Sequence, residues 1–227
     1  MLNITVHAAA APVARLLLVH GAGAPVQSSF FQQLIPRLTD NGIEVHAANF
    51  AYMELTRNGM RRVAPQAEKL VAEFAEMVQA VLSQRSDLPL WLGGKSMGGR
   101  VLSMYLATDL VAAPVAGAVV FGYPLCPPAS VKDAEKAALT IAARSRCLNN
   151  LARPVLICQG SRDAFGTVSD IQRCLTGSAE TSLSLLELTA ADHDFAVLKR
   201  SGFTSEQIFS QAALATVEFI RRHHQGH

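Results

Sequence analysis

Residues 90–100 read LWLGGKSMGGR, an apolar run that leads into four glycines gathered around one serine. Glycine loses more backbone entropy on folding than any other residue, so four in so short a stretch indicate a local structural demand. Gly94 to Gly98 fit the pattern GxSxG, in which the serine occupies a strained turn and small neighbours let a strand and a helix pack closely. The stretch therefore predicts a strand, a sharp turn at Ser96 and a helix.

Strand-like and helix-like segments alternate along the rest of the chain. Short apolar runs cover residues 15–20, 43–50, 89–94, 115–122, 154–160 and 183–189, with a weaker one at 2–8. Segments with helical periodicity cover residues 30–38, 64–84, 97–110, 133–148, 168–177 and 205–222. This alternation predicts an α/β fold with a mostly parallel, doubly wound sheet and helices on both faces. Residues 1–227 show no internal repeat or linker, which predicts a single domain.

The composition is that of an ordinary globular chain. Of its 227 residues 50% are hydrophobic and 17% charged, and 20 basic and 18 acidic residues give a net charge of +2. Because the two signs are interspersed, we expect neither nucleic acid nor a membrane as a partner. The longest apolar stretch, residues 110–123, is too short to span a bilayer and contains Pro114. The first residues lack the basic start and apolar centre of a signal peptide, which favours the cytoplasm.

Four cysteines occur without CxxC pairing or the spacing of a zinc site. A chain of this length does not need disulfides to fold. We therefore predict free, mostly buried thiols, with no metal site and no cofactor. The four are Cys126, Cys147, Cys158 and Cys174.

Ser96 needs two partners if it is a nucleophile. A serine hydroxyl attacks only when a base takes its proton and a carboxylate holds that base in the right tautomer. Behind a GxSxG turn, the acid and then the histidine follow the serine in chain order, each on a loop after a later strand. Asp163 follows the run at 154–160 and His193 follows the run at 183–189. Ser96, Asp163 and His193 are the predicted catalytic triad.

The competing residues have weaker positions. Asp192 and Asp194 flank His193 on its own loop, where a good contact with Nδ1 is harder to make. Two structural alternatives stand beside the triad: Asp163 as a turn cap and His193 as a core histidine. The other histidines lie in or beside predicted strands, or on a terminal segment expected to be solvated: His7, His46, His223, His224 and His227.

The tetrahedral oxyanion requires a pair of N–H donors. The backbone N–H of Met97, at the start of the helix after Ser96, is the first candidate. Ala22 in the stretch HGAGAP is the second, with Gly21 and Gly23 keeping the backbone uncrowded. His20 is predicted to support this loop by hydrogen bonding rather than to act in catalysis.

Two phosphate-binding motifs are partly matched and are not favoured. GGKS resembles the end of a P-loop, but that motif requires glycine where Pro89 stands. GAGAPV fails as a dinucleotide loop because its third glycine position is Val26. We expect Lys95 to be partly exposed or paired with an acid near the turn. Arg100, one helical turn past Ser96, is expected to anchor a carboxylate of the protein or of a substrate, and a purely structural role is the alternative for both residues.

The motifs HGAGAP, GGKSMGGR, GYPLCPP, QGSRDAFG and ADHDF resemble, in this order, a small group of dienelactone-hydrolase-like α/β-hydrolases. The group includes the testis-expressed protein thirty and the hydrolase-like subunit of a histone-acetylation complex. The resemblance spans roughly residues 15–199 and implies the α/β-hydrolase fold with the same three residues as a triad. The group carries histidine where this chain has Cys126, and proline where it has Ala164.

These observations predict a metal-free serine hydrolase of the carboxylesterase type. Its partner would be a small acyl substrate: an ester, a thioester or an activated amide. Between the runs at 115–122 and 154–160 there is room for a crossover helix and a short proline-rich loop, so we expect a minimal lid or none. The alternative is a non-catalytic binding module that keeps the fold. The sequence leaves the oligomeric state open.

Overall fold

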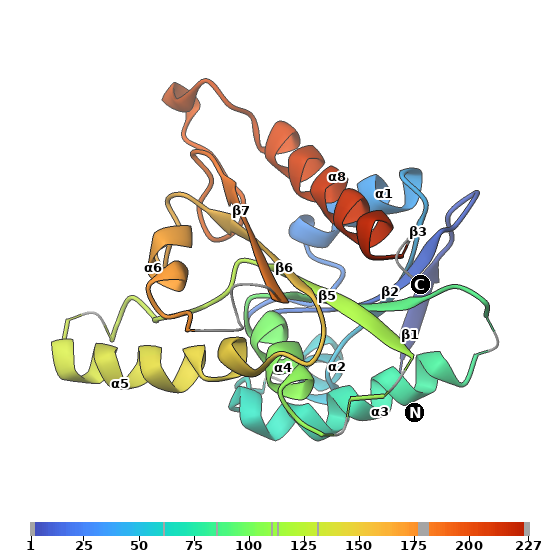
Figure 1. Ribbon diagram of the computed structural model, residues 1–227, viewed down its shortest axis with the longest axis horizontal. Helices are drawn as coiled ribbons and strands as arrows, with labels where there is room; N and C mark the ends of the chain where they lie inside the picture. The colour runs from blue at the N-terminus through green and yellow to red at the C-terminus, as the bar shows by residue number, and fades with distance from the viewer. Residues whose placement is uncertain are drawn as a thin grey trace.

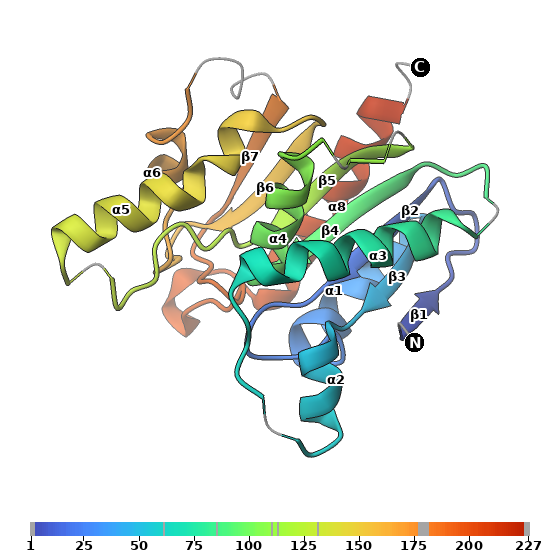
Figure 2. The same ribbon diagram turned by 90° about the horizontal axis from the view of Figure 1, so that it is seen from below.

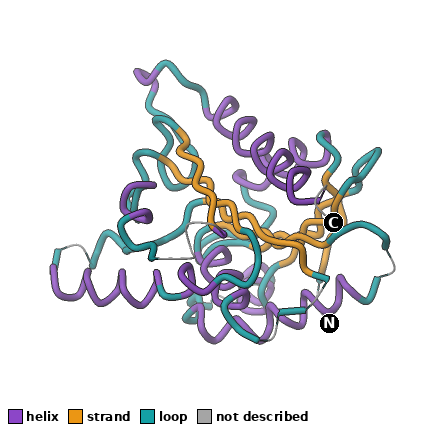
Figure 3. The backbone as a smooth tube through the Cα atoms, in the orientation of Figure 1, coloured by secondary structure: helices purple, strands orange, loops and turns teal. Residues whose placement is uncertain are grey.

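The computed structural model describes residues 3–60, 62–84, 86–109, 111–112, 114–130, 132–176 and 182–224. In this part of the chain seven strands form one twisted sheet in the order β1-β3-β2-β4-β5-β6-β7 (Figures 1 and 3). All neighbours are parallel except β1, which pairs antiparallel with β3 at the edge. The strands are β1 (Ile4–His7), β2 (Ala14–Val19), β3 (Ile43–Ala48), β4 (Leu90–Lys95), β5 (Val115–Phe121), β6 (Val155–Gly160) and β7 (Leu183–Leu188).

Helices cover both faces of the sheet (Figures 1 and 2). The α-helices are α1 (Ser29–Asp40), α2 (Ala51–Arg57), α3 (Val71–Leu82), α4 (Met97–Leu106), α5 (Ala134–Ser145), α6 (Val168–Gln172) and α8 (Ser205–His224). Three short 3-10 helices are η1 (Ala67–Leu70), η2 (Cys147–Asn150) and η3 (Lys199–Ser201). Helices α1 and α8 lie side by side on one face, and α3 and α4 lie on the other.

The alternation of side chains along β2 divides the core into two layers. Leu16 and Leu18 point to the layer under α1 and α8, whereas Leu17 and Val19 point to the layer over α3 and α4. All four are fully buried, as expected for a central strand that is covered on both faces. The mostly parallel, doubly wound fold predicted from the sequence is therefore confirmed.

Several details differ from the predicted elements. Helix α2 was not predicted, because its two buried residues, Tyr52 and Met53, are adjacent and give no helical repeat. The helix expected from residue 64 begins as an α-helix only at Val71, after η1. Helix α6 ends at Gln172, well short of 177. Between β5 and β6 the described residues contain a loop, α5 and η2, and no lid domain.

The cysteine prediction is confirmed, since all four thiols are free and three of them are buried. His223, expected on a solvated terminal segment, is half-buried in the structure, and His227 lies outside the described residues. The ring centroid of His223 lies 4.3 Å from that of Phe219 and 6.2 Å from that of Trp91, because α8 continues to His224 and carries the ring along the sheet. Among the described residues, no helix has the length and apolar character required to cross a bilayer.

Candidate active site

Ser96 occupies the sharp turn between β4 and α4. Its backbone angles are φ 51° and ψ −115°, a conformation that costs a non-glycine residue roughly 1–3 kcal/mol. The backbone N–H of Ser96 donates to the carbonyl of Phe121 at 3.0 Å, which ties the turn to the end of the neighbouring strand. The strained turn leaves the side chain partly exposed at the carboxyl edge of the sheet.

The glycines around Ser96 are required by close backbone contacts. A Cβ on Gly94 would lie 2.5 Å from the backbone of Gly98 and Gly99, where α4 crosses the end of β4. A Cβ on Gly98 would lie 2.5 Å from the carbonyl oxygen of His20. These distances are far below any real Cβ contact, so the glycines let strand, helix and the loop after β2 meet at one point.

The structure brings Ser96, His193 and Asp163 together from three separate loops. Ser96 Oγ lies 2.8 Å from His193 Nε2, and Asp163 Oδ2 lies 2.7 Å from His193 Nδ1. Both contacts are within hydrogen-bonding distance. With Asp163 ionised, Nδ1 carries the proton and donates it to the carboxylate, which leaves Nε2 free to accept the hydroxyl proton of Ser96.

Asp163 is held in place by further donors. Its side chain is completely shielded from solvent. Gln159 Nε2 donates to Oδ2 at 2.8 Å, and the backbone N–H of Phe165 donates to Oδ1 at 2.8 Å. The ring of Phe165 lies 4.3 Å from the ring of His193, so one short segment both fixes the carboxylate and supports the imidazole.

The two acids beside His193 have other contacts. Asp192 Oδ1 accepts the backbone N–H groups of Asp194 and Ala196, each at 2.9 Å, and so shapes its own loop. Asp194 pairs with Lys95 at 3.2 Å. Of the three acids compared in the sequence, Asp163 is the one that contacts the His193 ring.

Lys95 connects the end of β4 to the loop that carries His193. Its Nζ donates to the carbonyl of His193 at 2.8 Å and lies 5.2 Å from the ring centroid of Phe30. Burial lowers the pKa of Lys95, although the carboxylate of Asp194 opposes the shift. Lys95 is only 5% exposed, so the expectation of partial exposure is wrong, and the alternative, pairing with an acid, is what the structure contains.

The loop after β2 lies directly against Ser96. A Cβ on Gly21 would be 3.3 Å from the Cβ of Ser96, whereas one on Gly23 would meet nothing within 4 Å. No hydrogen bond among the described residues uses the backbone N–H of Ala22. The N–H of Met97 opens α4 and so has no partner within the helix. Both candidate oxyanion donors therefore lie beside the serine with N–H groups that no described residue occupies.

His20 supports the 21–24 loop through a hydrogen bond of its ring. Its Nε2 accepts the backbone N–H of Phe50 at 3.0 Å, so Nδ1 carries the proton and donates to the carbonyl of Gly21 at 2.5 Å. Burial lowers the pKa of His20 to about 4, which keeps the ring neutral at physiological pH. Tyr52 adds its hydroxyl, which donates to the carbonyls of Gly21 and Ala22. The contacts are those of a loop support.

The remaining predicted residues, Cys126 and Arg100, have contacts with segments other than the 21–24 loop. The backbone N–H of Cys126 donates to the carbonyl of Phe165 at 2.8 Å, and its side chain is buried. Arg100 pairs with Glu68 of η1, so the carboxylate it anchors in the structure belongs to the protein. Sequence reasoning missed Gln159 and Phe165, although a glutamine inside the apolar run at 154–160 is a signal for a buried polar contact.

A comparison with models of protein families identifies the family of the chain. The model of a family described as an alpha/beta hydrolase domain matches residues 12–221, which is most of the sequence. The chain belongs to the alpha/beta hydrolase family. No curated protein matches it significantly by sequence.

Solved structures share the fold of this alpha/beta hydrolase at low sequence identity. Dienelactone hydrolase from Anabaena variabilis is 16% identical, with a TM-score of 0.69 over 97% of this chain and 91% of its own. Est1E from Butyrivibrio proteoclasticus is 11% identical, with a TM-score of 0.68 over 97% and 95%. The monoacylglycerol lipase of Paleococcus ferrophilus is 15% identical, with a TM-score of 0.66 over 98% and 99%.

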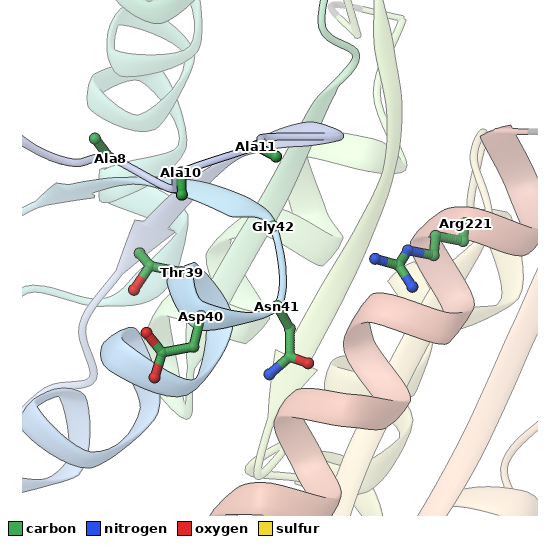
Figure 4. A pocket seen from close by; sticks show the side chains of 8 residues that line it. All are labelled: Ala8, Ala10, Ala11, Thr39, Asp40, Asn41, Gly42 and Arg221. Atoms are coloured by element: carbon green, nitrogen blue, oxygen red, sulfur yellow. The ribbon is translucent and has the colours of Figure 1, made fainter.

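Two cavities of this alpha/beta hydrolase lie at opposite ends of the sheet. One of about 400 Å³ is bordered by Ser96, His193, Phe165, Lys95 and the 21–24 loop. A larger one, about 480 Å³, lies at the amino ends of the strands, between the β1–β2 loop, the end of α1 and α8 (Figure 4). Within the described residues, no group of three or more His, Cys, Asp or Glu side chains is arranged to hold a metal ion.

Proposed function

We propose that the protein is a serine hydrolase of the carboxylesterase type that works through an acyl-enzyme. The observation that carries the proposal is the continuous set of contacts from Ser96 Oγ to His193 and on to Asp163. Esterase, lipase and dienelactone hydrolase are the names of proteins with a similar fold, which supports hydrolysis as the reaction class. The motif GGKSMGGR further supports membership of the small hydrolase group that the sequence resembles.

In the proposed reaction His193 Nε2 takes the hydroxyl proton as Ser96 Oγ attacks the scissile carbonyl carbon. The N–H groups of Ala22 and Met97 stabilise the oxyanion of the tetrahedral intermediate. His193 then gives its proton to the leaving group as the bond to that group breaks, which leaves an acyl ester on Ser96. Water repeats the sequence, with His193 again the base, and releases the acid and free Ser96.

A fluorophosphonate probe tests whether Ser96 is activated. We expect one covalent adduct by intact mass, mapped to the peptide that contains Ser96 and absent from Ser96→Ala. The matched control is Ser103→Ala, because Ser103 lies on the same helix but is buried and bonded to the carbonyl of Gly99. No adduct, or one that survives Ser96→Ala, would support the rival function, a non-catalytic binding module.

Short acyl groups are the proposed substrates, because no lid domain lies between β5 and β6 in the described chain. Little apolar surface is then offered to a long chain, and each buried methylene is worth about 0.8 kcal/mol. A series of p-nitrophenyl esters, measured below and above micelle formation, should show higher kcat/KM for short chains and no rise at the interface. A preference for long chains would contradict this part of the proposal.

A further inference from the structure

A second group of charged side chains lies on the α4 side of Ser96. Arg100 comes from α4, Glu68 from η1 and Arg144 from the end of α5. In Figures 1 and 2 the carboxyl-terminal end of α5 lies next to α4, and packing of η2 against α4 holds it there. Three segments distant in sequence thus bring two guanidinium groups and one carboxylate together.

The backbone places Arg100 one helical turn after the nucleophile. The N–H of Arg100 donates to the carbonyl of Ser96 at 3.0 Å, so the two residues are one helical turn apart. Side chains on an α-helix lean toward its amino end, and Arg100 therefore extends back toward the level of Ser96.

Arg144 is tied to the loop that borders the same site. Its Nη1 donates to the carbonyl of Pro124 at 2.6 Å, and its own carbonyl accepts the hydroxyl of Tyr123 at 2.5 Å. This loop starts at Gly122, where a Cβ would lie 3.2 Å from His193 Nδ1. It continues to Cys126, whose backbone bonds the carbonyl of Phe165.

Arg100, Arg144 and Glu68 together carry an excess of positive charge. Burial, and then the positive charge of Arg100, lower the pKa of Arg144. Burial opposes ionisation of Glu68, but its backbone N–H and the two arginines lower the pKa of its carboxyl group. One carboxylate, with a side chain that is 50% exposed, thus faces two guanidinium groups.

One N–H donor of the Arg100 guanidinium, at Nε, lacks an acceptor within the described part of the chain. The side chain is only 14% exposed, and its Nε is buried without a hydrogen-bond partner among the described residues. A buried N–H of a charged group that lacks an acceptor is unfavourable, so the group is better suited to a state in which a further acceptor is present.

Resting on the function proposed above, we propose that Arg100 and Arg144 form a subsite for a carboxylate on the acyl part of the substrate. The cavity beside His193 and Phe165 accepts the leaving group, because His193 must protonate that group. The acyl part then extends to the other flank, over the first turn of α4. The proposed substrates are monoesters or monothioesters of short dicarboxylic acids. A guanidinium binds their free carboxylate with two parallel hydrogen bonds.

Two esters of equal length test the subsite. Benzyl hydrogen glutarate ends in a carboxylate and benzyl pentanoate in a methyl group, and release of benzyl alcohol is measured by chromatography at fixed ionic strength. We expect kcat/KM to favour the anionic ester by about 10- to 100-fold. Equal values for the two esters would overturn the proposal even with Ser96 active.

Variants separate the subsite from a structural role. Arg100→Gln and Arg144→Gln should each lower kcat/KM for the anionic ester by about tenfold or more beyond any change in kcat/KM for the neutral ester, so that most of the preference is lost. Glu68→Gln removes the competing carboxylate and should increase the preference, whereas loss of a merely structural pair would lower both values together. Arg146→Gln is the control, since Arg146 is exposed and the change in net charge is the same.

A binding measurement keeps the subsite testable if neither ester is cleaved. Glutaramate and pentanamide differ in one carboxylate, and ligand-detected NMR compares their binding to the wild type and to Arg100→Gln. We expect glutaramate alone to bind, and Arg100→Gln to abolish its binding. Binding of glutaramate without turnover or probe labelling would reject the hydrolase but keep the subsite; equal binding of the two amides would reject the subsite.

Discussion

The two ends of the sheet differ in how their backbone is built. At the carboxyl ends, the loops after β4 and β7 contain Ser96, Ala190 and Phe195, the non-glycine residues with positive φ among those described. At the amino ends, the turn before β3 adopts positive φ at Gly42, where it costs little. The carboxyl end therefore holds strain in the two loops that carry Ser96 and His193.

Judged by cavity volume alone, the amino end of the sheet would be the better candidate for a functional site. The cavity at the amino end is larger, about 480 Å³ against about 400 Å³, yet Ala8, Ala10, Ala11 and Gly42 supply half of its lining residues. The smaller cavity borders a serine, a histidine and a buried lysine that contact one another through hydrogen bonds. Convergent polar groups on a strained backbone mark the candidate site better than volume does.

The largest expected effect concerns the acid that orients His193. Asp163→Asn should lower kcat by about 10⁴-fold, because an amide in place of the carboxylate favours the wrong imidazole tautomer. Asp192→Asn and Asp194→Asn should each cost less than about tenfold, since an amide at position 192 keeps the Oδ1 acceptor and the Asp194 side chain is 77% exposed. Steady-state kinetics on one short ester compares all three, and a larger loss from either neighbour would show that the acid is wrongly assigned.

The next effect compares glycines at the two ends. Gly98→Ala should destabilise the protein by at least about 3 kcal/mol, because its Cβ would lie 2.5 Å from the carbonyl oxygen of His20 and the backbone must separate. Gly42→Ala at the amino end should cost roughly 1–2 kcal/mol, the usual penalty for positive φ with a contact of 3.1 Å to Ala11. Urea unfolding measures both, and equal losses would remove the contrast in packing.

A smaller effect follows from the histidine beneath the 21–24 loop. The pKa of His20 is about 4 in the folded protein and about 6.5 when unfolded, so the unfolded chain binds the proton first as pH falls. The free energy of unfolding should therefore decrease from pH 6.5 to pH 4, by up to about 3 kcal/mol from this residue. His20→Gln, which keeps an acceptor for the N–H of Phe50, should flatten the curve in this window. If the free energy of unfolding changed with pH in the same way in the wild type and in His20→Gln, the lowered pKa of His20 would be contradicted.

The fold and the positions of the candidate residues were predictable because parallel strands end at one edge of a sheet. Ser96, Asp163 and His193 each follow a strand, so their meeting required only that the strands be identified correctly. The edge strand β1 and helix α2 were harder, since four residues in one and seven in the other contain too little periodicity to identify them.

Features that depend on packing between distant segments were not predictable. The burial of Lys95 requires Phe30 from α1 and the loop after β7, and nothing in GGKSMGG encodes either neighbour. The stacking of Phe165 on His193 likewise depends on the distance between the loops after β6 and β7. Arg100 was expected to meet a carboxylate of the protein or of a substrate, and only the structure provides Glu68 as its partner.

Substitutions in the cavity at the amino ends of the strands should have the smallest effect, with no clear change in activity or stability. In Figure 4 the Arg221 guanidinium extends from α8 into the opening, whereas the Asp40 carboxylate, on the opposite wall, points away from it. Asn41, which also lines the opening, donates its side-chain amide N–H to the carbonyl of Arg37, so it supports the end of α1. The opening lies at the amino ends of β2 and β3, and Ser96 lies at the opposite edge of the sheet. Arg221→Gln and Asp40→Asn should therefore leave kcat/KM for a short ester within about twofold and the free energy of unfolding within about 0.5 kcal/mol, as for exposed surface sites generally. A tenfold loss of activity in either variant would show that the larger, unstrained cavity contributes to function and would overturn the contrast between the two ends.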